Sequence, residues 1–271
     1  MTLDVYAMTR RAMVGSTLAA VAGTTACARP RSVSSPRSLT LAELIHRNTV
    51  ARGGAAALDR MHSLVAEVEV SEGGHLVGGP YAATKEGFVR VDIYVGGKNV
   101  YSEGVDRAGV WLWTGGPGPA QPSVATGAAN ALTNGAEDKL FGWNRFPERG
   151  HKMALMPPAL LDGINYQVVE VRYSTGQISY FYVHPASWQA ERRRDERAYH
   201  PDMSQTKQRI ESRYFDFGAV AGVVASRRSV DIDLDTGKML SSGRTLGRRI
   251  NPTLAADYFD RQTRAPATRP A

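Results

Sequence analysis

The stretch from Tyr166 to His184, YQVVEVRYSTGQISYFYVH, decides the fold class. Apolar and aromatic residues recur at every second position on both sides of STGQ, which is the period of a strand with one buried face. A glycine in the middle of such a pattern favours a tight hairpin, so we predict an antiparallel hairpin with Thr175 and Gly176 as its two turn residues. This register places three cross-strand pairs on one apolar face: Val169 with Tyr182, Val171 with Tyr180, and Tyr173 with Ile178.

The same period of two extends over much of the chain. From Leu64 onward, short alternating segments end at glycine-containing turns, as in residues 64–70, 88–95 and 109–114. The sequence therefore predicts a mainly β (α+β) protein with an antiparallel sheet. Residues 121–162 interrupt the pattern with sequence rich in Ala, Gly and Pro. We expect short helices and loops there that pack over the sheet, either as a lid or plug or as a plain structural crossover.

One helix is predicted before the first strand. Thr40-Leu41-Ala42-Glu43 forms a capping box, in which a hydroxyl and a carboxylate accept from free amides at a helix start. Gly53-Gly54 should end this helix, and a second short turn should follow over residues 55–61. These helices would lie at the amino end of the folded domain and provide an apolar stripe that can cover a sheet.

The amino terminus has the pattern of an export signal. Arg10-Arg11 precedes a short stretch of small and apolar residues that ends at Cys27, the only cysteine among the 271 residues. The arginine pair resembles a twin-arginine signal, and Thr24-Thr25-Ala26-Cys27 resembles a lipobox, although Leu usually stands where Thr24 is. We expect residues 1–27 to be removed and Cys27 to be acylated. A plain secretory signal with an incidental cysteine is the alternative.

Composition divides the remainder of the chain. Residues 28–38 combine prolines with almost no apolar residues and predict a flexible linker. Residues 39–261 are expected to form a single domain, and the Pro-, Arg- and Ala-rich residues 262–271 a disordered tail. The formal net charge is +7, but the basic residues are scattered. The one dense run, Arg192-Arg193-Arg194 with Arg197, lacks interleaved aromatic residues, so no nucleic-acid partner is expected.

Motifs that carry catalysis or metal binding are missing from the sequence. It contains no Gly-x-Ser-x-Gly, no His-Glu-x-x-His, no phosphate loop and no complete dinucleotide fingerprint. Residues 231–237 space their aspartates like a calcium loop, but Thr236 and Ser242 replace its essential Gly and Glu. A strand that ends at a Thr236-Gly237 turn explains these residues better. We therefore expect no metal, no cofactor and no enzymatic activity.

Diffuse landmarks between about residues 40 and 261 make the chain similar to the outer-membrane lipoprotein-sorting superfamily, the LolA- and LolB-like carriers and receptors. The landmarks are Ala51-Arg52-Gly53-Gly54, Ala57-Leu58, His62-Ser63-Leu64, Asp162-Gly163, Tyr180-Phe181-Tyr182-Val183, Tyr214-Phe215-Asp216-Phe217, Val220-Ala221-Gly222-Val223, Ile250-Asn251-Pro252 and Phe259. His184-Pro185 departs from the family pattern, in which an Asp often opens the segment after Tyr182. Residues 115–162 do not align.

The resemblance implies an incomplete antiparallel β barrel or strongly curved sheet, covered by helices, with an apolar cavity for acyl chains. We expect the cavity wall to include two strand tryptophans and the predicted hairpin face: Trp111, Trp113, Val169, Val171, Tyr173, Ile178, Tyr180 and Tyr182. Alternatively, the tryptophans fill a core.

The expected function is binding of an acyl chain, lipid or lipoprotein in envelope trafficking. The expected protein is a monomer on the periplasmic side, tethered to the outer membrane through acylated Cys27. An envelope scaffold that binds a protein partner and an unrecognised hydrolase are the alternatives. A converging nucleophile and base would identify the hydrolase.

Overall fold

The computed structural model describes residues 39–269. The predicted signal peptide, Cys27, the linker at 28–38 and the last two residues of the tail lie outside the described residues. Within residues 39–269, no helix is long and apolar enough to cross a membrane.

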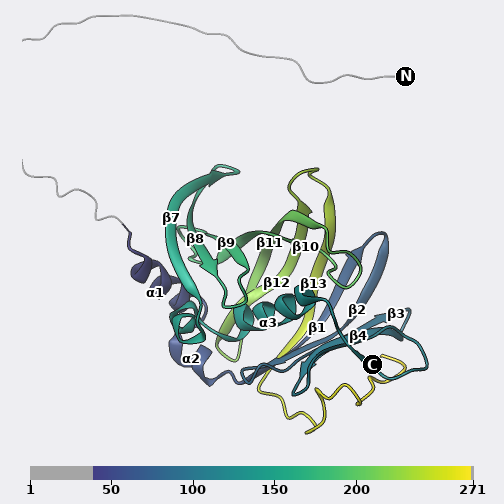
Figure 1. Ribbon diagram of the computed structural model, residues 1–271. Helices are drawn as coiled ribbons and strands as arrows, with labels where there is room; N and C mark the ends of the chain where they lie inside the picture. Colours follow the sequence, from purple (N-terminus) through teal and green to yellow (C-terminus); the bar gives the residue numbers. More distant parts are fainter. Residues whose placement is uncertain (1–38, 270–271) are drawn as a thin grey trace, which may run out of the picture. The chain divides into compact units, whose positions relative to one another are not determined.

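Helices and strands occupy most of the described chain (Figure 1). The helices are α1 (Leu41–Ala51), α2 (Ala55–Arg60), α3 (Thr126–Leu140) and the 3-10 turns η1 (Trp143–Arg145) and η2 (Pro147–Arg149). The strands are β1 (Ser63–Glu72), β2 (His75–Thr84), β3 (Val89–Val95), β4 (Lys98–Asp106), β5 (Gly109–Trp113), β6 (Gln121–Pro122), β7 (Lys152–Leu161), β8 (Ile164–Arg172), β9 (Ile178–Val183), β10 (Ala190–Ala198), β11 (Lys207–Val220), β12 (Val223–Asp233) and β13 (Met239–Ile250).

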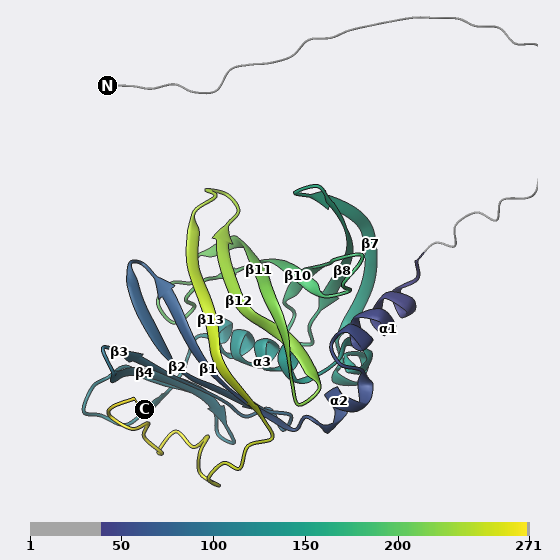
Figure 2. The same cartoon turned by 180° about the vertical axis from the view of Figure 1, so that it is seen from behind.

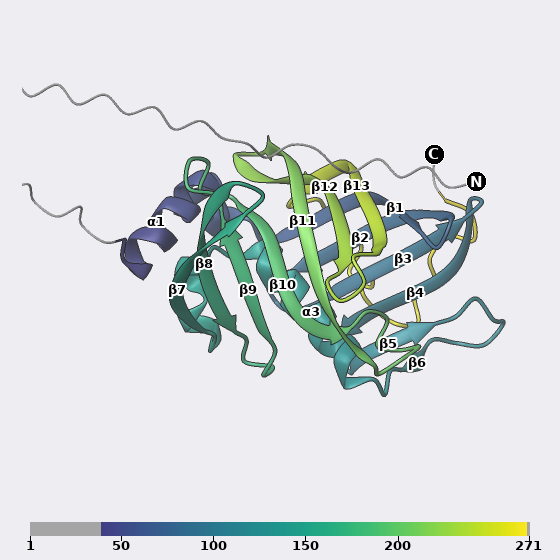
Figure 3. The same cartoon turned by 90° about the horizontal axis from the view of Figure 1, so that it is seen from above.

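All thirteen strands belong to one antiparallel sheet with the order β6-β5-β4-β3-β2-β1-β13-β12-β11-β10-β9-β8-β7. Neighbours in the sheet are neighbours in the chain, except where β1 pairs with β13. The sheet curves strongly and stays open, because β6 and β7 are its two edges and do not pair with each other (Figures 1 and 3). The prediction of a mainly β protein with a curved, incomplete barrel is confirmed.

Helix α3 connects the two edges of the sheet and lies within its concave side (Figures 1 and 2). The segment 121–162 therefore contains a long crossover helix in place of the short helices that we expected. Its last part is also a strand, β7, which the sequence pattern hides. Pro157-Pro158 falls at a break in the pairing of β7 with β8, between Met156 and Ala159. An edge strand tolerates these prolines because its outer side has no ladder partner.

The β8–β9 hairpin forms, but its register differs from the prediction by one residue. Tyr173 N donates to Gln177 O and Gly176 N donates to Tyr173 O, both at 2.9 Å, so the loop contains the three residues Ser174-Thr175-Gly176. Val169 consequently pairs with Phe181, and Val171 with Ser179. Because side chains alternate along a strand, this shift places the two halves of the predicted face on opposite sides of the sheet.

Two clusters of buried side chains pack between the sheet and its helices. In the first cluster, α2 and α3 pack on the inner face of β1 and its neighbours through Leu58, Leu64, Val89, Leu132 and Leu140. The second cluster joins α1 and η1 to β8 and β9 through Leu44, Trp143, Phe146, Val169, Val171, Tyr173, Phe181 and Val183. The core is thus divided along the concave face.

One of the two hydrogen bonds of the predicted capping box forms at the start of α1. Glu43 N donates to Thr40 Oγ1 at 3.2 Å, as a cap requires. The Glu43 carboxylate pairs with Arg47, one turn further along the helix.

The tail that was expected to be disordered lies against the sheet as far as Arg269. Arg269 Nε donates to Glu67 Oε1 at 2.9 Å, and Asn99 N donates to Ala267 O at 3.0 Å. Thr268 forms an isolated bridge with Lys98. Ion pairs and backbone hydrogen bonds attach this tail to the sheet. A search for apolar residues therefore does not detect that it is ordered.

Candidate functional site

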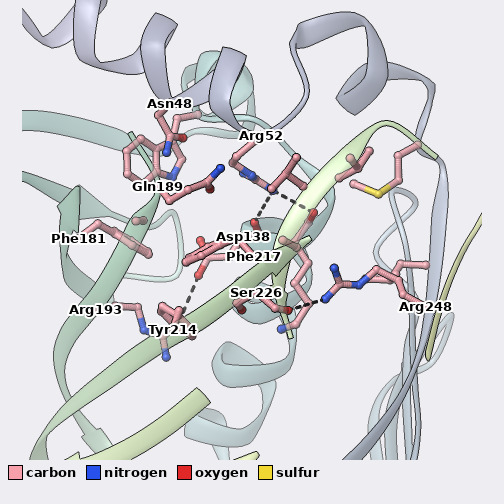
Figure 4. Close-up of a pocket in the computed structure, with 18 of the residues that line it drawn as sticks. Asn48, Arg52, Asp138, Phe181, Gln189, Arg193, Tyr214, Phe217, Ser226 and Arg248 are labelled. Carbon is pink, nitrogen blue, oxygen red and sulfur yellow. Dashed lines mark hydrogen bonds and ion pairs between the residues drawn. The ribbon is translucent and has the colours of Figure 1, made fainter. Parts of the chain in front are cut away.

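A cavity of about 190 Å³ lies on the concave face, between the two core clusters (Figure 4). One water molecule needs roughly 10–15 Å³ on the same measure, so the cavity has room for a chain of several atoms. Its apolar wall comes from both clusters and from the strands between them: Met61, Leu64, Trp143, Phe181, Ala190, Phe217, Val223, Val224, Ala225 and Ile250. Its polar lining is Asn48, Arg52, Asp138, Lys139, Gln189, Arg193, Tyr214, Ser226 and Arg248.

The junction between α1 and α2 brings Arg52 to the cavity. A Cβ on Gly53 would lie 1.9 Å from Gly222 O, so only glycine lets this junction approach the β11–β12 turn. Val224 N also donates to Arg52 O at 3.0 Å. Two landmarks of the family resemblance, Arg52-Gly53-Gly54 and Ala221-Gly222-Val223, therefore meet at the cavity.

A second junction holds the first and last strands together beside the cavity. The Asn251 side chain accepts from His62 N at 2.7 Å and Ser63 N at 3.1 Å, and it donates to Arg60 O at 2.8 Å. Asn251 has a φ of 51°, a left-handed conformation that Asn adopts more readily than most residues. Two more landmarks of the resemblance, His62-Ser63-Leu64 and Ile250-Asn251-Pro252, therefore meet at this junction. The contact positions Leu64 and Ile250 in the cavity wall.

Asp138 at the end of α3 is the only carboxylate in the lining. It accepts from Tyr173 Oη at 2.6 Å, and its Oδ2 lies 3.3 Å from Arg193 Nη1. Burial raises the pKa of Asp138, whereas Arg193 and Tyr173 favour its ionised form. Burial also raises the pKa of Tyr173 far above the usual value.

The other cations of the cavity bind backbone carbonyls. Arg52 donates to Phe141 O at 2.7 Å and to Asp138 O and Lys139 O at 3.1 Å, which satisfies free carbonyls at the end of α3. Lys139 Nζ donates to Gly135 O, and Arg248 Nη2 donates to Ser226 O, both at 3.0 Å. Lost hydration lowers the pKa of Arg52 to about 10 and that of Lys139 to about 8.

The structure does not place the predicted wall residues around this cavity. Val169, Val171 and Tyr173 are buried in the second core cluster, beside the cavity. Tyr180 and Tyr182 pack with Tyr166 and Val168 on the other face of the sheet, and Ile178 follows the same alternation. The predicted common face is therefore wrong. Phe181, which was not among the predicted wall residues, is the hairpin residue that lines the cavity.

The two predicted tryptophans also lie elsewhere. Their neighbour Val110 packs against the first core cluster, so alternation directs Trp111 and Trp113 to the convex side. The Arg90 guanidinium lies 5.6 Å from the centre of the Trp111 ring, and Arg264 of the tail lies 4.9 Å from that of Trp113. Trp111 fills a core, which was the alternative interpretation.

The dense basic run is distributed over both faces of β10. Arg192 Nη1 and Arg194 Nε lie 3.2 Å and 2.6 Å from the carboxylate of the buried Glu211. Arg193 and Arg197 turn to the other face and contact Asp195 at 3.1 Å and 3.2 Å. This part of the net charge is thus paired inside the protein.

The residues of the rejected calcium loop form the end of β12 and its turn. The Asp233 carboxylate accepts from Asp235 N at 2.8 Å and from Thr236 N at 3.3 Å, as a turn requires. Residues 39–269 contain no group of three or more His, Cys, Asp or Glu side chains that could hold a metal ion.

The sequence matches no protein-family model and no curated protein. Three solved structures resemble the fold. A DUF1329 family protein from Desulfovibrio piger has a TM-score of 0.52 and 10% identity over 80% of this chain and 95% of its own. A domain described as outer membrane lipoprotein-sorting from Vibrio parahaemolyticus has a TM-score of 0.53 and 10% identity, with the same coverage.

The third is a LolA superfamily protein from Nitrosomonas europaea, with a TM-score of 0.53 and 15% identity over 82% of this chain and 98% of its own. All three are covered almost completely, so the likeness extends over the whole architecture. The described part of this chain has the fold of the lipoprotein-sorting, LolA-like proteins.

Proposed function

We propose that this protein binds a lipid or lipoprotein acyl chain in the cavity between its sheet and its helices. The observation that carries the proposal is the cavity itself, which has an apolar wall from both core clusters and opens on the concave face of an incomplete barrel. Two of the similar structures are described as lipoprotein-sorting or LolA proteins, which supports the same class of ligand.

Burial of an acyl chain is the main source of free energy for such binding. Each buried methylene contributes about 0.8 kcal/mol, so a chain of ten buried methylenes gains roughly 8 kcal/mol. This gain must offset an association cost of about 4–15 kcal/mol. A long chain is therefore needed for tight binding.

A binding role agrees better with the geometry than hydrolysis does. Among residues 39–269, no Ser or Thr hydroxyl forms a hydrogen bond with a histidine nitrogen. The buried His151 is already used on both sides, because Nε2 contacts Glu137 and Nδ1 accepts from Ser174 N at 3.0 Å. His184 Nδ1 accepts from two backbone amides of its own turn. Among residues 39–269, these contacts leave no histidine base beside a hydroxyl nucleophile.

The proposal includes tethering of the domain to the periplasmic side of the outer membrane through acylated Cys27. In cells fed radiolabelled palmitate, we expect label in the wild-type protein and none in Cys27→Ser, while both proteins are exported. Equal labelling of the two would contradict the tether and leave lipid binding untouched.

Native mass spectrometry of the full-length protein, followed by lipid extraction, tests the binding role. We expect a bound mass that dissociates as a lipid. Ala225 lines the cavity, so Ala225→Phe should fill it and remove the bound mass. Ala219 is exposed on the paired strand, and Ala219→Phe serves as the control that keeps the lipid. Wild-type protein without bound lipid, from cells or after incubation with lipid vesicles, would overturn the proposal.

A further inference from the structure

The lining of the cavity has an excess of positive charge. Four cations line it, Arg52, Lys139, Arg193 and Arg248, against the single carboxylate of Asp138. Arg52 follows α1, and the other three lie on α3, β10 and β13, so the fold brings together charges that are far apart in the sequence. Figure 4 shows Arg52, Arg193 and Arg248 around Asp138.

Only one of these cations has a carboxylate partner. Arg193 contacts both Asp138 and Asp195, within 3.3 Å. Within residues 39–269, no Asp or Glu oxygen lies within 4.0 Å of the charged nitrogens of Arg52, Lys139 or Arg248. Their hydrogen-bond partners are neutral carbonyls, and Lys139 Nζ also lies 4.6 Å from the centre of the Tyr81 ring. The buried Arg248 Nε has no hydrogen-bond acceptor among the described residues.

An uncompensated cluster of this kind is unfavourable unless an anion completes it. A buried charge without a counter-ion costs free energy, and like charges close together add to that cost. The pKa values report both effects: Arg248 helps to lower the pKa of Arg52, and Arg193 and Arg248 help to lower that of Lys139. Arg52, Arg193 and Arg248 are half-buried, and Lys139 is exposed to solvent. In other folded proteins, cations that lose much of their hydration are usually paired with carboxylates or bind an anion.

We propose that the cavity binds an amphiphile with an anionic head group, a carboxylate or a phosphate, which contacts Lys139 and Arg248 beside Arg52 while its chain follows the apolar wall. This inference rests on the proposed lipid-binding function and names its ligand class. A neutral lipid would leave the cations unpaired, and a free anion would leave the wall beside Phe181 and Ile250 without a ligand.

Calorimetric titration of the delipidated full-length protein tests the inference with four probes. These are oleate, oleyl alcohol, 1-oleoyl lysophosphatidate and inorganic phosphate. We expect either acidic amphiphile to bind at least about tenfold more tightly than the alcohol, the equivalent of one charge-assisted contact. The tighter of the two acids identifies the head group. Inorganic phosphate should bind only weakly because it lacks a chain.

Variants separate the cluster from general surface charge. Lys139→Met and Arg248→Met should each reduce the preference for oleate over oleyl alcohol, with unchanged binding of the alcohol. Arg244→Met is the control, because Arg244 lies on the same strand as Arg248, is 63% exposed and pairs with Glu69 outside the cavity. Lys139 is accessible, so Lys139→Met keeps the test usable if Arg248→Met does not fold.

The outcomes distinguish the two proposals. Equal binding of oleate and oleyl alcohol would overturn the anionic head group and leave lipid binding intact. Equal binding of phosphate and oleate would overturn the amphiphile. Absence of binding for every chain-bearing probe would overturn the proposed function itself.

Discussion

Asn251 offers a quantitative test of the junction between the first and last strands. Its side chain makes three hydrogen bonds to backbone groups of residues 60–63, and its φ of 51° is left-handed. A typical hydrogen bond contributes about 0.5–1.5 kcal/mol net. Water can replace part of each bond because the residue is exposed, so we take roughly 1.5–2 kcal/mol for all three.

Three substitutions divide this free energy of unfolding. Asn251→Ala removes all three bonds and places a residue with Cβ in a left-handed conformation, which adds about 1 kcal/mol, for a total near 3 kcal/mol. Asn251→Gly loses the same bonds without the backbone cost, about 2 kcal/mol in all. Asn251→Asp keeps the acceptor for the two amides and should cost only about 1 kcal/mol.

Equilibrium unfolding in urea measures this order. The midpoint should fall in the order Asp, Gly, Ala with an unchanged slope, and the melting temperature should drop by roughly 2–4 °C per kcal/mol. If Asn251→Gly were as destabilising as Asn251→Ala, the left-handed backbone conformation would make no contribution to the loss of stability. Losses below about 0.5 kcal/mol for all three would mean that water replaces these bonds completely.

Three further perturbations test the core, the close contact and the cavity charge. Val171 is fully buried beside the cavity, so Val171→Arg should unfold the protein, and a folded variant in thermal melting would contradict this packing. Gly53→Ala should destabilise by at least about 2 kcal/mol in urea, because its Cβ would overlap Gly222 O; a loss below about 0.5 kcal/mol would exclude the close approach. Oleate affinity should fall between pH 7 and 9, since the pKa of Lys139 is about 8 and deprotonation removes a cation, while Arg52, with a pKa of about 10, stays mostly charged. Lys139→Arg should abolish this fall, and a wild-type affinity independent of pH would exclude a role for the Lys139 charge.

Local sequence signals predicted the fold because each one depends on neighbouring residues. The period of two, the Thr40 cap and the glycine turns are physical preferences of short segments. The hairpin register was beyond them. The same sequence is compatible with a two-residue turn at Thr175-Gly176 and with the observed three-residue loop. The two loops differ in the position that the left-handed Gly176 occupies within them. The one additional loop residue shifts the register by one, so side chains that were predicted to share a face of the sheet lie on opposite faces.

The cavity could not be predicted for a different reason. Its cations are contributed by four elements between Arg52 and Arg248, and only the completed sheet brings them together. The strand β10 also hides its role, since its alternating arginines pair with Glu211 on one face and Asp195 on the other. A pattern of apolar residues cannot report a strand whose inward side chains are charged.

The pairing of β1 with β13 has a consequence for the time at which the cavity forms. Leu64 on the first strand and Ile250 on the last face the same cavity, so the wall is incomplete until almost the whole domain has been synthesised. Pairing of strands so distant in sequence is slow, because closure of the intervening chain costs entropy before any contact forms. A folding intermediate that lacks β13 has no cavity to occupy. On the proposed function, the ligand therefore enters a finished domain.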